Sequence, residues 1–201
     1  MLDIFGEKLL TEVYLQQFDL WVDGCPSFHD EETTSIQKIV NDYVQKRTTL
    51  KVANHKLCSL VLEMDSIKTG AVNAIRRLME KLPLVQPLKG CKSKNELWNT
   101  YVDPLLDSLL SNLENGVHLR WTNLNGTEQG SERPDSVISV IMQSDWGKTL
   151  GYGEAKIAEP TDNKFIMLAW DLCRLGHFSK ETINTTNNKS SISFQVKDSL
   201  S

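Results

Sequence analysis

The chain has 201 residues, of which 40% are hydrophobic and 24% are charged, and its formal net charge is −4. This size fits one or two packed domains, and the negative charge argues against tight, non-specific nucleic-acid binding while leaving room for a local basic face. No stretch reaches the roughly 18 apolar residues that a membrane span needs, and the start of the chain lacks the features of a signal peptide. With four widely spaced cysteines, we expect reduced thiols and an intracellular protein, nuclear or cytoplasmic.

The first half of the chain is expected to be helical. Apolar residues recur at helical spacing in four stretches: 4–13, 36–44, 57–67 and 71–82. Gly70 is the expected break between the last two helices. We therefore assign residues 1–90 to a helical N-terminal region, which is either an interaction module or a helical layer packed on the second half.

The second half of the chain, residues 91–201, mixes helical and strand patterns. The expected elements are a helix at 95–112 interrupted by Pro104, strands at 117–122, 136–142 and 150–158, a helix at 164–178 and a last strand at 191–196. A turn is expected over 144–148, and a polar loop over 184–191. The fold class is therefore α/β, with the order helix, three strands, helix, strand.

Three charged residues lie at the ends of the predicted hairpin. Asp135 comes just before its first strand, while Glu154 and Lys156 end the second. Because alternate residues of a strand share a face, Glu154 and Lys156 point the same way. With a turn centred on residues 145–146, Asp135 lies opposite Lys156, with Cβ atoms about 5 Å apart. Two carboxylates and one ammonium that converge in this way can hold a divalent metal ion and activate water.

Asp135 followed by Glu154-x-Lys156 resembles the signature of the PD-(D/E)XK nuclease superfamily, whose core usually reads helix, three antiparallel strands, helix, strand. The resemblance covers roughly residues 92–197 and implies a restriction-endonuclease-like αβββαβ core within residues 91–201. A group of fungal proteins with this core is also similar, through Trp98, Leu119-Arg120-Trp121, Arg133-Pro134-Asp135 and the helix at 164–178. Related cores often continue after the last strand, so a shortened C-terminus is part of the expectation.

The resemblance implies a chemistry and a set of partners. Mg²⁺ or Mn²⁺ would be held by Asp135, Glu154 and the carbonyl of Ala155, since hard cations prefer oxygen ligands. Lys156 would orient the attacking water or stabilise developing negative charge during phosphodiester hydrolysis. We expect a nucleic-acid substrate, DNA ahead of RNA. A homodimer is a further expectation, because many such nucleases cut duplexes as dimers.

Two of the sequence features have a structural alternative. Glu96 is a candidate for the acidic residue that the family often carries on its first helix, but Ser93-x-x-Glu96 is also a capping-box pattern. Trp98 and Trp121 could stack on bases or pack in the core.

The function itself has an alternative from another class. A nuclease-fold protein that has lost turnover could serve as a nucleic-acid-binding or protein-interaction module. The acidic net charge and the short C-terminus favour that alternative. The complete set of Asp135, Glu154 and Lys156 favours the enzyme.

Overall fold

The computed structural model of the chain describes residues 26–85, 93–122, 133–157 and 164–197. The helix predicted at 4–13 lies outside these residues. The elements are, in chain order, α3 (Asp30–Val44), α4 (Leu50–Leu60), η1 (Val61–Glu63), α5 (Ser66–Lys81), α6 (Lys94–Leu97), η2 (Trp98–Val102), α7 (Asp103–Leu110), η3 (Leu113–Asn115), β1 (Val117–Trp121), β2 (Ser136–Met142), β3 (Asp145–Lys156), α8 (Lys164–Thr186) and β4 (Ile192–Lys197). The predicted α/β class is confirmed, and the elements from residue 94 onward follow the predicted order.

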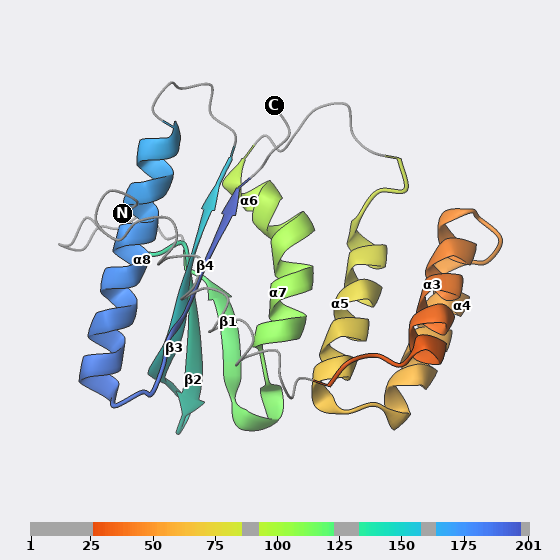
Figure 1. Cartoon of the computed structure of the whole chain (residues 1–201), viewed down its shortest axis with the longest axis horizontal. Helices are drawn as coiled ribbons and strands as arrows, with labels where there is room; N and C mark the ends of the chain where they lie inside the picture. Colours follow the sequence, from red (N-terminus) through yellow and green to blue (C-terminus); the bar gives the residue numbers. More distant parts are fainter. Residues whose placement is uncertain (1–25, 86–92, 123–132, 158–163, 198–201) are drawn as a thin grey trace, which may run out of the picture.

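The elements form successive layers around one sheet (Figure 1). The sheet has the strand order β1-β2-β3-β4, in which β1, β2 and β3 are antiparallel and β4 runs parallel to β3. Helix α8 packs on β3 and β4, while α6 and α7 cover the opposite face. Helix α5 packs on the outer side of α7, and α3 and α4 lie farthest from the sheet.

The N-terminal helices form a layer on the second half of the chain. They have a small apolar core of their own, centred on the fully buried side chains of Ala53 and Leu57. Helix α5 joins this layer to α7, where Arg77 forms an ion pair with Asp107. The structure places this layer against α7 through α5, and its use as an interaction module stays a prediction.

The predicted break at Gly70 is wrong, because α5 runs through this residue. The break lies earlier, where the side chain of Asp65 accepts hydrogen bonds from the backbone N–H groups of Ile67 and Lys68 and so caps the start of α5. This is a favoured way to begin a helix. Gly70 instead lets two helices approach closely, since a Cβ atom there would lie 2.9 Å from the backbone oxygen of Ser108 on α7.

Substituting Gly70 with alanine should destabilise the protein despite the better helix propensity of alanine. The added methyl group would push α5 away from α7, and we expect a net loss of about 1–2 kcal/mol in the free energy of unfolding. Gly176 is the matched control: it also lies inside a helix, but a Cβ atom there would meet nothing within 4 Å. Gly176→Ala should stabilise by roughly 0.5–1 kcal/mol in the same urea titration. Equal effects of the two substitutions would contradict the close contact.

The continuous helical segment that covers the sheet, formed by α6, η2 and α7, contains a π-helical turn. Residues 98–102 of η2 join α6 to α7, so that Pro104 stands in the first turn of α7, where a proline is tolerated. The predicted interruption at Pro104 is therefore a change of helix type. Trp98 of this turn is 1% exposed and stacks on Trp121 at a ring-centroid distance of 4.4 Å. For Trp98, the core-packing interpretation is confirmed.

The hairpin between β2 and β3 turns earlier than predicted. The strand predicted at 136–142 is confirmed, but β3 begins at Asp145 and the turn consists of Gln143 and Ser144. Both turn residues have positive φ, 51° and 67°. Positive φ at both central positions is typical of the tight turn that matches the twist of two antiparallel strands.

Helix α8 is longer than predicted, and it continues through Thr186 into the stretch predicted as a loop. Its buried residues are both apolar and polar. Leu175 is fully buried, and the polar residues Asp171 and Thr182 are buried too, whereas Leu172 is 49% exposed. No helix in the described ranges combines the length and the hydropathy that crossing a membrane requires.

Candidate functional site

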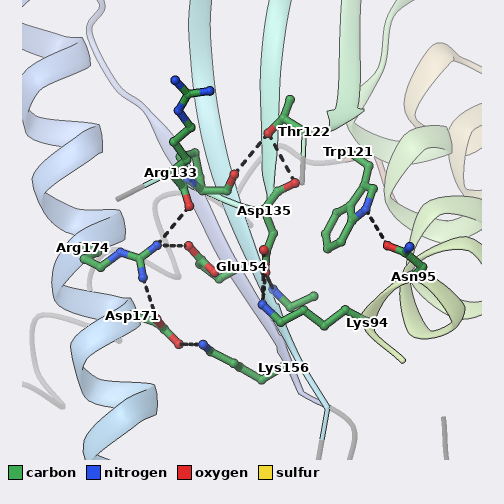
Figure 2. Close-up of polar contacts among 12 residues, drawn as sticks. Lys94, Asn95, Trp121, Thr122, Arg133, Asp135, Glu154, Lys156, Asp171 and Arg174 are labelled. Atoms are coloured by element: carbon green, nitrogen blue, oxygen red, sulfur yellow. Dashed lines mark hydrogen bonds and ion pairs between the residues drawn. The ribbon is translucent and has the colours of Figure 1, made fainter. Parts of the chain in front are cut away.

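The site is built around Asp135, which directly precedes β2. Its backbone carbonyl accepts a hydrogen bond of 2.8 Å from the N–H of Thr122, at the end of β1. Its carboxylate accepts a buried hydrogen bond of 2.9 Å from the N–H of Ala155 on β3. Asp135 is 6% exposed. Because backbone groups of two neighbouring strands hold it from both sides, its carboxylate has a fixed position on the sheet (Figure 2).

Irregular pairing between β2 and β3 brings Glu154 next to Asp135. Near the turn Met142 pairs with Asp145, whereas at the far end Ser136 pairs with Gly153 after two shifts of register. Without these shifts the spacing at the turn would place Tyr152, not Glu154, beside Asp135. The predicted pairing of Asp135 with Lys156 is wrong, because the turn lies earlier than predicted; the two shifts of register then move the residue opposite Asp135 from Tyr152 to Glu154. Such bulges re-aim side chains, often next to active sites.

Glu154 is a buried carboxylate in a crowded electrostatic setting. Its side chain is 2% exposed, and its Oε1 accepts a hydrogen bond of 2.6 Å from Arg174 on α8. Burial is the main cause that raises the pKa of Glu154 to about 7, and the adjacent Asp135 contributes by charge repulsion and by a hydrogen bond between the two carboxyl groups, while Arg174 acts in the opposite direction. Two carboxyl groups that approach this closely do not both ionise readily at neutral pH.

Lys156 lies on the same face of β3 as Glu154, as predicted. Its Nζ is 3.1 Å from an oxygen of Asp171 on α8. Asp171 also accepts a hydrogen bond of 3.2 Å from Arg174, which lies one helical turn further along α8. The pair Asp171 and Arg174 therefore holds both Lys156 and Glu154 against α8 (Figure 2).

A third cation reaches the site from α6. The Nζ of Lys94 lies 3.3 and 3.2 Å from the two carboxylate oxygens of Asp135. Three buried carboxylates, those of Asp135, Glu154 and Asp171, are thus accompanied by three cations: Lys94, Lys156 and Arg174.

The sequence analysis did not identify Lys94 or Asp171 as residues of the site. The guanidinium of Arg174 contacts Glu154 and Asp171 within the protein. Asp171 left a signal in the sequence, since it is an acidic residue within an apolar helical stripe and lies three residues before an arginine. Lys94 left none beyond its place in the first turn of a helix.

Glu96 lies in the same helical turn as Lys94, and it is exposed. Its backbone N–H donates a hydrogen bond of 3.2 Å to Ser93 Oγ, which is one half of the capping box predicted for this pair. The residue of α6 whose side chain forms an ion pair with Asp135 is Lys94.

The arrangement brings together two carboxyl side chains, those of Asp135 and Glu154. Within the part of the chain that the structure describes, no group of three or more His, Cys, Asp or Glu residues is arranged to hold a metal ion. A cation at this site would therefore depend on Asp135, Glu154, the Ala155 carbonyl and water. The nearby Asp171 is already engaged by Lys156 and Arg174.

Comparisons of this chain with models of protein families, with curated proteins and with solved structures found no match.

Proposed function

We propose that this protein is a Mg²⁺- or Mn²⁺-dependent nuclease that hydrolyses phosphodiester bonds in nucleic acid, with DNA preferred over RNA. The observation that carries the proposal is the pair of buried, adjacent carboxyl groups of Asp135 and Glu154, in which the pKa of Glu154 is raised to about 7. A divalent cation between them would offset a repulsion that the fold otherwise sustains. The order of helices and strands and the place of Asp135, Glu154 and Lys156 in it agree with the PD-(D/E)XK pattern that the sequence resembles.

The donor set fits a hard divalent ion. Mg²⁺ is commonly held by one or two carboxylates, with water and substrate phosphate completing its coordination. Asp135 and Glu154 would supply the carboxylates, and the carbonyl of Ala155 would supply a further oxygen. When bound, the ion would lower the pKa of a coordinated water and stabilise charge on the scissile phosphate.

The surrounding residues prepare these ligands for the reaction. The N–H of Ala155 fixes Asp135, and Arg174 holds Glu154 through a hydrogen bond of 2.6 Å. Lys156 shares a strand face with Glu154 and would place its ammonium beside the attacking water or the developing negative charge. Asp171 keeps Lys156 in position through an ion pair of 3.1 Å.

The alternative, a nuclease-like protein without turnover, also has an observation in its favour. Each of the three buried carboxylates is already paired with a cation of the protein. A charge-balanced cluster of this kind could be purely structural, since a buried ion pair can persist without catalytic use. Metal binding together with cleavage separates the two functions.

The decisive experiment is calorimetric titration with Mg²⁺ and Mn²⁺ at pH 8, followed by incubation of the same samples with plasmid DNA, single-stranded DNA and RNA. We expect the wild type to bind the ion and cleave, and Asp135→Asn to lose both while keeping its circular dichroism spectrum. Asp145→Asn is the matched control, because it changes an exposed aspartate at the other end of the same hairpin. It should behave as the wild type does.

The other outcomes of this experiment are equally informative. Metal binding without cleavage of any of these substrates would favour the inactive, binding alternative. Absence of metal binding by the wild type would reject the proposed function.

A further inference from the structure

Lys94 occupies an unusual place for a lysine. It is the first residue of α6, where the exposed N–H groups of a helix create positive potential and a cation is disfavoured. Its ammonium is directed to Asp135, with both oxygens within 3.3 Å. The ion pair offsets the unfavourable position of the lysine.

The geometry of this pair leaves little room for a second cation. The Nζ atom of Lys94 is almost equidistant from the two oxygens of Asp135, at 3.3 and 3.2 Å, so it faces the open side of the carboxylate. The N–H of Ala155 contacts Oδ2 at 2.9 Å. A divalent ion that took Asp135 as a ligand would add positive charge close to this ammonium, and like charges repel strongly at short distance.

The two members of the pair differ in their freedom to move. The side chain of Asp135 is 8% exposed and is held by the backbone of β3, whereas the side chain of Lys94 is 33% exposed. Within the described residues, the ammonium of Lys94 contacts the two carboxylate oxygens of Asp135. Lys156 and Arg174, in contrast, are anchored by the buried Asp171. Of the three cations, Lys94 is the one that can move into solvent while the rest of the cluster stays in place.

We propose that Lys94 is the resident counter-ion of the site, which neutralises Asp135 in the metal-free protein and is displaced when a divalent ion binds. This inference rests on the proposed function, since it concerns the same ion. It assigns to Lys94 a role that opposes metal binding, so that its removal should strengthen the binding of the metal. A lysine with a purely structural role would have the opposite effect, because its loss would disturb the ligands.

The test compares Lys94→Met with Lys94→Arg, which keeps the charge, in calorimetric titrations with Mn²⁺ alone at pH 8. Because Lys94 is the partly exposed member of the pair, displacing its ammonium is modest in energy, and we expect Lys94→Met to bind Mn²⁺ roughly three- to tenfold more tightly than the wild type. Lys94→Arg should stay close to the wild type. Lys180→Met controls for the loss of one positive charge, since Lys180 is an exposed residue of α8, and it should leave the affinity unchanged.

Thermal unfolding supplies a second readout that does not depend on catalysis. Without metal, Lys94→Met should unfold at a Tm roughly 2–4 °C below that of the wild type, because two buried carboxyl groups lose a neighbouring cation. Saturating Mn²⁺ should raise the Tm of this variant by more than it raises the Tm of the wild type.

The outcomes separate this inference from the proposed function. If the wild type binds Mn²⁺ and Lys94→Met binds it equally or more weakly, Lys94 is not a competing counter-ion, although the metal site stands. If neither protein binds Mn²⁺, both proposals are overturned. If Lys180→Met also binds Mn²⁺ more tightly, the change in affinity follows from the net charge of the protein, and the specific role of Lys94 is rejected.

Discussion

Glu154→Gln is expected to make the metal-free protein more stable at pH 8 and, at the same time, to abolish divalent-ion binding. The fold raises the pKa of Glu154 from 4.5 to about 7, so the folded state holds this proton more tightly than the unfolded state does. As the pH rises from about 4.5 to 7, the unfolded chain ionises first, and the wild type loses stability. The rise in pKa from 4.5 to about 7 corresponds to a loss of about 3 kcal/mol in the free energy of unfolding. Glutamine keeps an oxygen for Arg174 but carries no charge to desolvate.

The measurement is urea unfolding of both proteins without metal, at pH values from 4 to 8. The difference in the free energy of unfolding should be near zero at pH 4 and should reach up to about 3 kcal/mol in favour of Glu154→Gln at pH 8. Mg²⁺ should then stabilise the wild type and leave the variant unchanged. A variant that is less stable than the wild type at pH 8 would show that the charge of Glu154 strengthens the fold, and the electrostatic basis of the proposed metal site would be lost.

The negative charges that would bind a divalent ion also destabilise the metal-free fold. This explains why the three carboxylates are surrounded by cations. Without a metal ion, Lys94 and Arg174 reduce the repulsion between Asp135 and Glu154. The cluster is therefore compatible with a folded protein without a metal ion, at a cost that appears as the raised pKa of Glu154.

The sequence predicted the elements of this site better than their contacts. Alternation along β3 correctly placed Glu154 and Lys156 on one face, and the order of elements brought Asp135 beside that face. The residue opposite Asp135 was predicted wrongly, because the turn lies at 143–144 and the register then shifts twice. A turn without glycine or asparagine has a weak sequence pattern, and so has irregular strand pairing. Neither the position of the turn nor the register shifts could therefore be predicted from the sequence.

The cations that complete the site arise from tertiary packing. Arg174 and Asp171 reach the strand because α8 lies across β3, and Lys94 reaches Asp135 because α6 begins near the end of the hairpin. Neither placement follows from spacing along the chain. The same holds for Gly70, whose role becomes visible only when α7 lies against α5.

Lys156→Met should separate catalysis from metal binding. Lys156 is held by Asp171, while Asp135 and Glu154 have their own supports in Ala155 and Arg174. Removing the ammonium should therefore leave the affinity for Mg²⁺ within about threefold of that of the wild type, because a positive charge near the ion does not serve as a ligand. The cleavage rate kcat should fall about 100- to 1,000-fold, as it does when a group that stabilises developing charge is lost.

The assay measures kcat and KM for DNA cleavage together with the Kd for Mg²⁺, on Lys156→Met and on two comparison variants. Lys148→Met removes a half-buried lysine from the same strand and should leave all three constants within twofold. Asp171→Asn weakens the anchor of Lys156 and should give an intermediate fall in kcat with KM little changed. Unaltered cleavage by Lys156→Met would remove Lys156 from the reaction, whereas a parallel loss of Mg²⁺ affinity would make it a structural support of the two carboxylates.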